Sequence, residues 1–418
     1  MRLVVFESSL RANFRPLSLT RPTFDLNFGI GTLLSRIEQR VGNKASDLYV
    51  PEYLRDVTQE KHPEVKVNEE VSQKCLLVNA LIGGRDEVWA TIDQAVSENI
   101  DVLSFDSQGN LVFGIAEEAN PDQFARKSKW SSSRAKPFVP EVDESALLRF
   151  PWKLVEENES AITEDFSRKY FERQHFEGNC ETRGSAFSIS NDADLERFVT
   201  LDSRKGPIII EDEAQIQSFS HLCGPCFIGK GSIVKSARIR EGTTIGENCR
   251  VGGEVEQSII SDYSNKNHDG FIGHSIVGSW VNLGALTTNS DLKNTYGEIK
   301  VNLGKKQVRT GSVKVGVFIG DFAKTAIGVM IGSGKSIGAS AQALGNVYDD
   351  VPSFTIYSGG PRNKAVEMYI DSAILTQKRM MARRGISMTG ALETMMKSVF
   401  KMTRRDRTDH HVSKGKFK

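Results

Sequence analysis

The sequence has few cysteines, no long apolar run and almost no net charge. Five cysteines among 418 residues are too few, and odd in number, for a disulfide framework, which favours a reducing compartment. The apolar part of the opening MRLVVFESSL is too short for a secretory signal, and no stretch is long enough to span a membrane. The formal net charge of +1 creates no field that would attract nucleic acid or an anionic membrane. We therefore expect a cytoplasmic protein with no nucleic acid partner and no membrane span.

The length and composition predict several domains. A chain of 418 residues with 39% hydrophobic residues has enough apolar material for two or three cores. We place a first domain at 1–195, a second at 206–350, and C-terminal helices with a basic tail at 360–418. The cations of this tail are Lys378, Arg379, Arg383, Arg384, Arg404, Arg405 and Arg407. A solvated tail is the simplest interpretation, and the sequence leaves open whether it binds a partner.

The first domain alternates strands with helices. The apolar run Leu3–Phe6 predicts a buried first strand, and Cys75–Ile82 predicts another. We expect helices at 30–40 and 86–99, and a strand, a turn and a second strand over 99–114. This alternation is typical of an α/β domain with Rossmann-like layers.

The second domain has a period of six residues. Aliphatic residues recur at this spacing in two registers, at Ile210, Ile216, Leu222 and Ile228 and then at Ile233, Ile239, Ile245 and Val251. The pattern resumes at Ile331 and Ile337 after an interruption that includes a predicted excursion at Leu292–Val313. A triangular coil of three short strands per turn requires one inward aliphatic residue per strand. Such coils normally wind left-handed, so we predict a left-handed parallel β-helix of hexapeptide repeats.

Two motifs in the sequence suggest chemistry that their context does not support. Cys223-Gly-Pro-Cys226 has the letters of a thioredoxin dithiol, but that chemistry needs the first thiolate at a helix N-terminus. Here the motif lies between Leu222 and Ile228 of the six-residue pattern, and no second ligand pair for zinc is nearby. Gly29-Ile-Gly31 lacks the third glycine and the preceding strand of a dinucleotide site. We expect neither a redox nor a dinucleotide role.

Two histidines of the second domain are candidates for acid–base chemistry. His268 and His274 are six residues apart, which places them at equivalent positions on successive faces of a regular coil. Histidine is the natural general base for an amine that attacks a thioester. Polar groups suited to hydrogen bonding and phosphate binding crowd the same region: Asn282, Asp291, Lys293, Asn294 and Tyr296. The spacing alone leaves open that both histidines are ordinary surface residues.

An arginine-rich loop follows the first predicted strand. Arg11, Arg15 and Arg21 lie among prolines and threonines directly after Phe6. In a doubly wound sheet, ligands bind beyond the carboxyl ends of the strands, and arginine suits a phosphorylated ligand such as a nucleotide. A solvated basic loop is equally compatible with these residues.

The run GENCRVGGEVEQSIISDYSNKNHDGFIGHSIVGSWVNLGALTTNSDLKNTYG resembles a group of sugar nucleotidyltransferases. This group is akin to the bifunctional N-acetylglucosamine-1-phosphate uridylyltransferase/glucosamine-1-phosphate N-acetyltransferase. The stretches FESSLRANFRPLSLTRPTFDLNFGI and FPWKLVEENESAITEDF also resemble it, so that the resemblance covers most of 1–350. It implies an α/β nucleotidyltransferase domain that joins a sugar 1-phosphate to a nucleoside triphosphate, with UTP and N-acetylglucosamine 1-phosphate as expected substrates and Mg²⁺ as cofactor. It also implies a homotrimer whose β-helix transfers acetyl from acetyl-CoA to an amino-sugar 1-phosphate.

The resemblance implies roles for residues of the β-helix. NHDGFIG falls on the segment that holds the acetyltransferase base, which selects His268 over His274. Asn282 falls on an asparagine that contacts the sugar, and Arg240 on an arginine that binds its phosphate. Backbone groups of Ala285 and Ala339 are expected to contact coenzyme A.

This sequence departs from the family pattern at several of its sites. Phe271 replaces a tyrosine, and Glu256 stands near the place of a substrate lysine, which affects acceptor recognition. The pyrophosphate loop Gly-x-Gly-Thr-Arg is replaced by RPLSLTRP, so we expect Arg15 and Arg21 to bind the substrate phosphates. Asn79 stands where a metal-binding aspartate is expected, and a neutral ligand alone binds Mg²⁺ weakly. Two alternatives therefore stay open: a nucleotidyltransferase whose β-helix only trimerises, and a non-catalytic regulatory or scaffold homologue.

Overall fold

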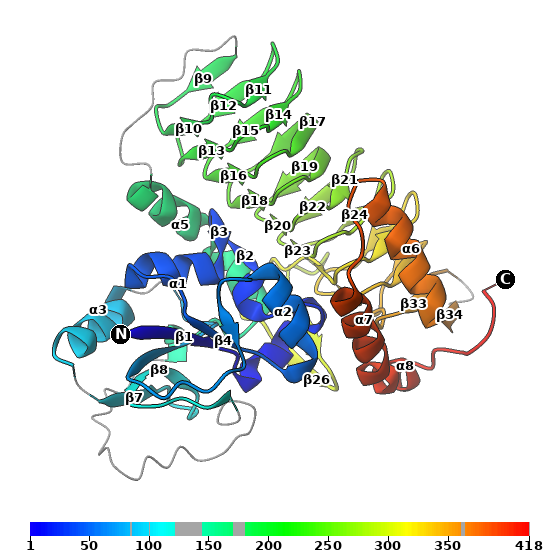
Figure 1. Ribbon diagram of the computed structural model, residues 1–418. Helices are drawn as coiled ribbons and strands as arrows, with labels where there is room; N and C mark the ends of the chain where they lie inside the picture. The colour runs from blue at the N-terminus through cyan, green and yellow to red at the C-terminus, as the bar shows by residue number, and fades with distance from the viewer. Residues whose placement is uncertain (84–85, 100, 122–143, 170–179, 361–363, 418) are drawn as a thin grey trace.

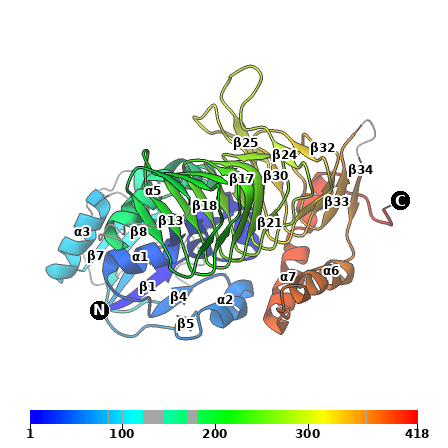
Figure 2. The same ribbon diagram turned by 90° about the horizontal axis from the view of Figure 1, so that it is seen from above.

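The computed structural model describes residues 1–83, 86–99, 101–121, 144–169, 180–360 and 364–417. It contains an N-terminal α/β domain, a left-handed coil of parallel strands and C-terminal helices, so the predicted fold class is confirmed. Figure 1 shows the N-terminal domain beside the coil and the C-terminal helices near its far end. Seen from above, the coil runs from helix α5 (Pro151–Lys169) to strands β33 (Thr355–Ser358) and β34 (Lys364–Glu367) (Figure 2).

The N-terminal domain is built on a six-stranded sheet with the order β5-β4-β1-β6-β8-β7. The strands are β1 (Arg2–Phe6), β4 (Asp47–Tyr49), β5 (Lys66–Val67), β6 (Cys75–Asn79), β7 (Val102–Phe105) and β8 (Leu111–Ala116). β1 pairs in parallel with β4 and β6, whereas β8 is antiparallel to β6 and β7. β6 is buried along its whole length, as expected for a strand covered on both faces. The predicted strands are confirmed, although β6 ends at Asn79 rather than Ile82.

The helices of this domain are α1 (Leu33–Val41), α2 (Arg55–Lys61) and α3 (Asp86–Ser97). α1 begins three residues later than the apolar pattern predicts because Thr32 caps it: its side chain accepts from the Ser35 N–H, and the Ser35 hydroxyl accepts from the Thr32 N–H. Such a reciprocal cap satisfies two backbone donors at a helix start. Gly42 ends the helix in the left-handed conformation, with φ of 70°.

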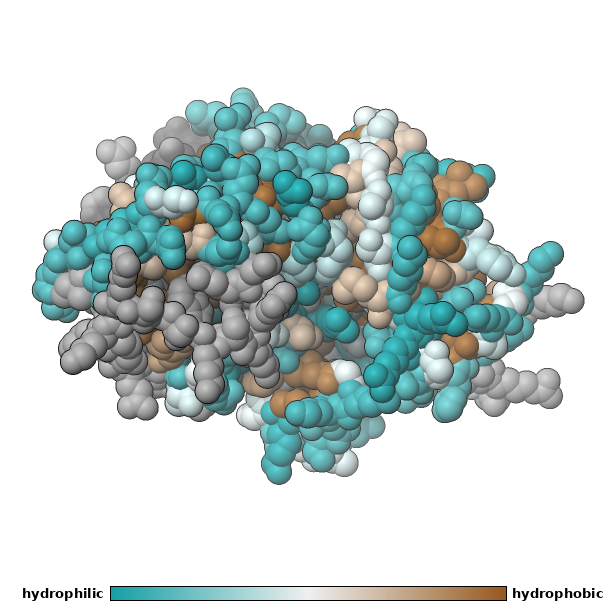
Figure 3. All heavy atoms as spheres, turned by 60° about the horizontal axis from the view of Figure 1, so that its bottom comes forward, coloured by the Kyte–Doolittle hydropathy of each residue, from teal (hydrophilic) through white to brown (hydrophobic). Residues whose placement is uncertain are grey.

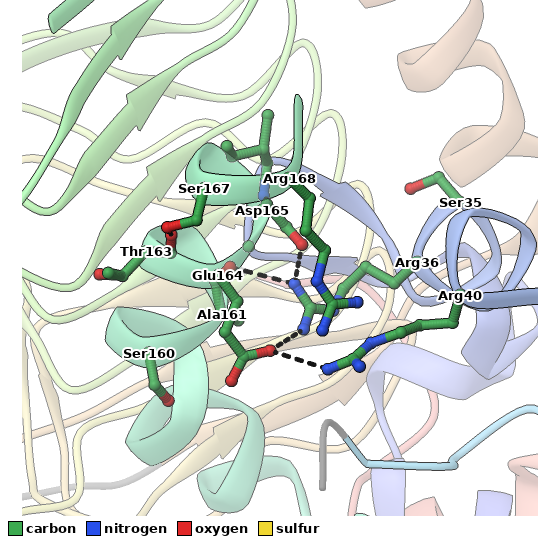
Figure 4. Close-up of polar contacts among 12 residues, drawn as sticks. Ser35, Arg36, Arg40, Ser160, Ala161, Thr163, Glu164, Asp165, Ser167 and Arg168 are labelled. Atoms are coloured by element: carbon green, nitrogen blue, oxygen red, sulfur yellow. Dashed lines mark hydrogen bonds and ion pairs between the residues drawn. The ribbon is translucent and has the colours of Figure 1, made fainter. Parts of the chain in front are cut away.

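Helix α5 joins the N-terminal domain to the coil. Arg36 of α1 donates to Asp165, to Glu164 Oε2 at 3.0 Å and to the Ala161 carbonyl at 3.0 Å, and Arg40 also reaches Glu164 (Figure 4). Asn158 of α5 contacts both parts of the chain: its Oδ1 accepts from the Gly29 N–H at 2.9 Å, and its Nδ2 donates to the carbonyl of Gly242 at 2.9 Å. Because its side chains are paired with both parts, α5 fixes the first domain against the coil.

The coil has three faces, which we call faces 1, 2 and 3. Face 1 is an eight-stranded parallel sheet of β10 (Phe187–Ile189), β13 (Ile208–Ile210), β16 (Cys226–Ile228), β18 (Thr243–Ile245), β20 (Ile259–Ile260), β23 (Ile276–Val277), β27 (Phe318–Ile319) and β30 (Ser336–Ile337). Face 2 comprises β11 (Asp194–Leu195), β14 (Gln215–Ile216), the first halves of β17 (Ile233–Ile239) and β19 (Arg250–Glu256), β21 (Asn265–Lys266), β28 (Lys324–Thr325) and β31 (Gln342–Leu344). Face 3 comprises β9 (Glu181–Arg183), β12 (Thr200–Asp202), β15 (His221–Cys223), the second halves of β17 and β19, β22 (Phe271–Gly273), β24 (Thr288–Asn289), β29 (Met330–Ile331) and β32 (Asn346–Val347).

The six-residue pattern marks the inward side chains, since Ile210, Ile216, Leu222 and Ile228 all lie in the apolar core of the coil. The coil begins before Gly206, however, because β9 already pairs with β12 and β10 with β13. Ile189, Leu195 and Leu201 are also six residues apart, but nine positions separate Leu201 from Ile210. Three extra residues at this corner interrupt the sequence period without interrupting the coil.

Between β24 and β27 the chain leaves the coil and forms an antiparallel ribbon of β25 (Lys300–Leu303) and β26 (Lys306–Arg309). This is the excursion predicted at Leu292–Val313. Ile299 and Val301 of the ribbon share an apolar cluster with Phe14 and Leu17 of the N-terminal loop, so the excursion also ties the two domains together.

The C-terminal helices are α6 (Ile370–Ala382), α7 (Gly390–Met402) and α8 (Arg404–Asp409). Met381 of α6 packs on Trp280 and Phe322 of the coil. Thr389, which caps α7, donates to Glu60 of α2 at 2.7 Å. Arg407 is buried and donates to Glu367 at 2.6 Å, so this part of the basic tail is packed rather than solvated.

The surface in Figure 3 is largely hydrophilic, with apolar residues in small groups. Within the described ranges, no helix combines the length and the apolar character that crossing a membrane requires. The larger exposed apolar side chains of the coil include Leu286, Ile327 and Met330; Leu286 and Ile327 lie on consecutive turns, and Met330 follows Ile327 on the same turn. They border the corner described next.

Candidate active site on the coil

His268 lies at a corner of the coil. Residues 267–270 turn the chain from β21 on face 2 to β22 on face 3, and His268 is exposed there. Its Nε2 lies 3.4 Å from Asn267 Nδ2. The Leu286 N–H donates to the Asp269 carbonyl at 3.0 Å, so the corner of the next turn stacks directly on this one. The imidazole is thus accessible to a bound molecule.

Lys266 holds the backbone beneath His268. It pairs with Val251 in the register of face 2, at an inward position, and only 3% of it is exposed. Its Nζ donates to the carbonyls of Gly252 and His268, both at 2.7 Å. Burial lowers the pKa of Lys266 to about 8. A Cβ at Gly253 would lie 2.7 Å from this Nζ, so a glycine is needed beside it.

A buried lysine at this position breaks the pattern of the coil. Lys266 lies midway between Ile260 and Ile272, both fully buried and both six residues away. A charged side chain in a core is costly unless it is compensated, so a local violation of this kind often marks a functional site. The interrupted hexad was a visible signal in the sequence, although we did not expect a role for Lys266.

Ala285 lies on the stacked corner next to His268. Its carbonyl accepts from the Gly328 N–H at 2.7 Å, whereas its own N–H donates to no group in the described part of the chain. Leu286 and Ile327 beside it are 62% and 78% exposed. The structure therefore brings together two predicted residues, His268 and Ala285, with a backbone donor and apolar surface.

Arg240 and Asn282 lie on different faces of the coil. Arg240 follows β17 on face 3, where its Nη1 is 3.8 Å from Glu254 Oε1. Asn282 lies on face 2, where its Oδ1 accepts from Asn265 Nδ2 at 3.3 Å, and Arg384 donates to the same Asn265 at 2.8 Å. One chain therefore does not bring these two predicted substrate residues together.

His274 lies at the opposite corner of face 3 and is buried. Its Nδ1 is 2.7 Å from Asp291 Oδ2. Burial opposes ionisation of Asp291, but the hydrogen bond and charge of His274 outweigh it and lower the pKa of this carboxyl group. The pair joins two consecutive turns, which gives His274 a structural function that His268 does not have.

The backbone groups of Ala339 are buried and hydrogen-bonded within the chain. It is fully buried, its N–H donates to Ser353 Oγ at 3.0 Å, and its carbonyl accepts from the Phe354 N–H at 2.9 Å. A Cβ at Gly320 would touch both Ala339 and Pro16 of the N-terminal loop. The first domain covers this part of the coil, and a resemblance in the repeat alone does not reveal that contact. We therefore do not propose that Ala339 binds coenzyme A.

The arginine loop after β1 folds against the coil. It forms the 3₁₀ turns η1 (Ser9–Phe14), η2 (Leu17–Leu19) and η3 (Thr23–Asp25). Arg21 Nη2 and Thr20 Oγ1 both donate to Asp321 Oδ2 of the coil, at 2.7 and 2.6 Å. Burial opposes the charge of Arg21, but Asp321 outweighs it and raises the pKa of the guanidinium. Of the two predicted phosphate-binding arginines, only Arg15 is exposed.

Asn79 does not fit a magnesium site. It is fully buried at the end of β6, where Nδ2 donates to the Leu111 carbonyl at 2.7 Å and Oδ1 accepts from the Leu81 N–H at 3.0 Å. Among the residues that the structure describes, no three His, Cys, Asp or Glu side chains are grouped to hold a metal ion. Mg²⁺ prefers carboxylates and phosphate oxygens, so we assign Asn79 a structural role at the end of β6.

The carboxyl edge of the sheet is filled by apolar side chains. Phe14, Leu17 and Leu81 pack in one cluster with Ile276 and Phe318 of the coil. In doubly wound sheets this edge is where a nucleotide would bind. Here it is largely an interface between the two domains.

Comparisons with known proteins find one matching family and several relatives. Residues 3–173 match the family described as sugar nucleotidyl transferase. A bifunctional sugar-1-phosphate nucleotidylyltransferase/acetyltransferase of Sulfurisphaera tokodaii is 38% identical over 33% of this chain and 35% of its own length. The bifunctional protein GlmU of Jannaschia sp. is 32% identical over 41% of this chain and 34% of its own length. GlmU of Nitratidesulfovibrio vulgaris is 25% identical over 67% of this chain and 55% of its own length. The chain thus spans between a third and just over half the length of these relatives.

Proposed function

We propose that this chain, whose residues 3–173 match the sugar nucleotidyl transferases, transfers acetyl from acetyl-CoA to an amino-sugar phosphate at the His268 corner. The observation that carries this proposal is Lys266, a buried ammonium group in the coil core that holds the His268 carbonyl at 2.7 Å. The exposed imidazole, the unused N–H of Ala285 and the cation of Arg240 complete the set of groups that this reaction needs. Relatives that carry both activities in their names support it.

In the proposed reaction, His268 is the general base. Its imidazole takes a proton from the amine of the sugar as the nitrogen attacks the thioester carbonyl. The new C–N bond forms, the C–S bond breaks, and the coenzyme A thiolate leaves and takes a proton from the imidazolium. Ala285 donates its N–H to coenzyme A, and Arg240 pairs with the sugar phosphate.

We infer that the complete site forms between copies of the chain. Arg240 and Asn282 lie on different faces, so a neighbouring subunit can supply the group that one chain lacks. A closed homotrimer would create three equivalent sites of this kind. The five free cysteines fit the reducing cytoplasm as the compartment of this reaction.

The test is coenzyme A release from acetyl-CoA and glucosamine 1-phosphate. We expect His268→Ala to lower kcat by roughly a hundredfold or more, the usual contribution of a general base. His274→Asn is the matched control, because it changes a histidine at the other corner of the same face. If His268→Ala releases coenzyme A at the wild-type rate, the proposed acetyl transfer at this corner is wrong.

A second candidate activity is nucleotidyl transfer by the N-terminal domain, with UTP and N-acetylglucosamine 1-phosphate. The family match over residues 3–173 favours it, and the exposed Arg15 could bind phosphate there. Pyrophosphate release from these substrates with added Mg²⁺ tests the activity, and its loss in Arg15→Ala would support the arginine. No pyrophosphate from the wild-type protein would favour a scaffold role for this domain.

A further inference from the structure

Face 3 carries charges in a definite order along the coil axis. In its register, the outward residue Phe271 stacks on Glu254, Glu254 on Arg238, and Arg238 on His221. Neighbouring strands are about 4.8 Å apart, so each step is one turn of the coil. Moving away from the His268 corner, a bound molecule would therefore meet a carboxylate first and cations afterwards.

A pocket of about 480 Å³ opens on the cationic part of this face. Its lining includes Arg204, Lys205, Arg238 and Arg240 together with Asp202 and Glu241, so four cations face two carboxylates. Arg204 pairs with Asp202 at 2.6 Å, and Lys205 pairs with Glu241 at 2.7 Å. Arg238 has no acidic partner within the part of the chain that the structure describes. The pocket therefore has an excess of positive charge.

Neutral groups line the rest of the pocket. His221, Cys223, Gly224 and Ile239 contribute to it, and Cys223 Sγ lies 3.6 Å from His221 Nε2. Burial, with Glu241 and Asp202 nearby, raises the pKa of Cys223, so the thiol stays protonated. Cys226 of the same motif is fully buried in the coil core. The CGPC motif thus shapes the wall of a binding pocket and does not present a reactive thiolate.

The pocket is longer than a single phosphate needs. Arg240 alone can pair with the phosphate of a sugar 1-phosphate. Asp202 lies two turns further from His268 than Arg240 does, or about 10 Å at the usual strand spacing. That length accommodates a second phosphate and a nucleoside.

We propose that the pocket binds the diphosphate and nucleoside of a nucleotide-linked amino sugar, so that the acetyl acceptor is a nucleoside diphosphate amino sugar. This rests on the proposed acetyl transfer. The order of charges fits such a molecule: the amine lies near His268 and Glu254, and the phosphates lie near Arg240 and Arg238. The nucleoside then lies beside Arg204 and the neutral wall.

The test compares UDP-glucosamine with glucosamine 1-phosphate as acceptors. We expect kcat/KM of the wild-type protein to be at least about tenfold higher for UDP-glucosamine. We expect Arg238→Ala to remove most of this preference while changing kcat/KM for glucosamine 1-phosphate less than about twofold. Lys230→Ala, which removes an exposed cation at another corner of the coil, should change neither. Equal kcat/KM for both acceptors would overturn the proposal, and a raised KM for acetyl-CoA in Arg238→Ala would assign the pocket to coenzyme A instead.

Calorimetry with UDP separates this proposal from the acetyl transfer itself. If neither acceptor is acetylated, the proposed function fails, but the pocket still makes its own prediction. UDP should bind the wild-type protein and should bind Arg238→Ala at least about tenfold more weakly. Absence of UDP binding to the wild-type protein would overturn the pocket assignment.

Discussion

The His268 corner and the N-terminal sheet edge both bury a cation, but in opposite ways. At the sheet edge, Arg21 is paired with a carboxylate, Asp321, which links the two domains at 2.7 Å. At the corner, the hydrogen bonds that the ammonium of Lys266 makes within the described ranges all go to backbone carbonyls. A buried cation that is paired with an anion can stabilise the fold, whereas a buried cation without an acidic partner lowers the stability of the folded protein. The comparison therefore indicates that Lys266, rather than Arg21, marks a functional site.

Among the variants that test this comparison, we expect Asp321→Asn to cause the largest loss of stability. The substitution leaves Arg21, whose side chain is only 13% exposed, without its anion, and breaking a buried pair typically costs about 3–5 kcal/mol. The free energy of unfolding, from urea denaturation at neutral pH, should fall by that amount. A loss below about 1 kcal/mol would mean that Arg21 is not clamped to the coil and is available to a ligand.

The buried charge of Lys266 predicts a pH-dependent stability difference. The pKa of Lys266 is lowered from 10.5 to about 8, so the unfolded chain binds more protons than the folded one between these pH values. The contribution of Lys266 to the free energy of unfolding therefore rises as the pH increases from about 8 to about 10.5, by up to about 3 kcal/mol. Other groups titrate in this range, so the quantity to measure is wild type minus Lys266→Met. A difference that is constant with pH would contradict the burial of this charge.

The same variant should separate activity from stability. Methionine keeps the length and apolar stem of Lys266 but releases the His268 carbonyl, so we expect kcat for acetyl transfer to fall about tenfold through lost orientation of the base. At pH 7, kcat and KM should be measured together, with the thermal midpoint recorded on the same sample. Unchanged kcat in a folded Lys266→Met protein would remove the positioning role of this lysine.

The smallest effect on stability is expected from Arg15→Ala. Arg15 is exposed and belongs to the same loop as Arg21, but no ion pair holds it in the described structure. Its substitution should change the free energy of unfolding by less than about 0.5 kcal/mol, as surface changes usually do. The matched Arg21→Ala variant should lose much more, and equal losses would contradict the distinction between the two arginines.

The regular part of the fold could be predicted from the sequence, because each coil strand demands one inward aliphatic residue. The hexads from Ile210 to Val251 gave the coil, and its true start near Glu181 was missed because three extra residues after Leu201 break the period. The role of Lys266 was missed for a related reason. The six-residue pattern was followed through aliphatic residues alone, so the lysine midway between Ile260 and Ile272 was passed over.

The contacts between domains could not be predicted from local pattern. Arg21 and Asp321 are 300 positions apart, and nothing near either residue in the sequence indicates the other. The same packing buries Ala339 and fills the sheet edge beyond Asn79, which is why two expected binding residues lie in closed surroundings. A resemblance that is read from the sequence cannot show which parts of the fold cover these residues.

Chemical rescue of His268→Ala by imidazole tests the central claim most directly. Because His268 is exposed at an open corner, free imidazole can reach the space that the substitution leaves. We predict that added imidazole restores coenzyme A release in His268→Ala in a concentration-dependent way and has no such effect on His274→Asn. Wild-type release by His268→Ala without imidazole, or rescue of His274→Asn alone, would contradict the assignment of the base.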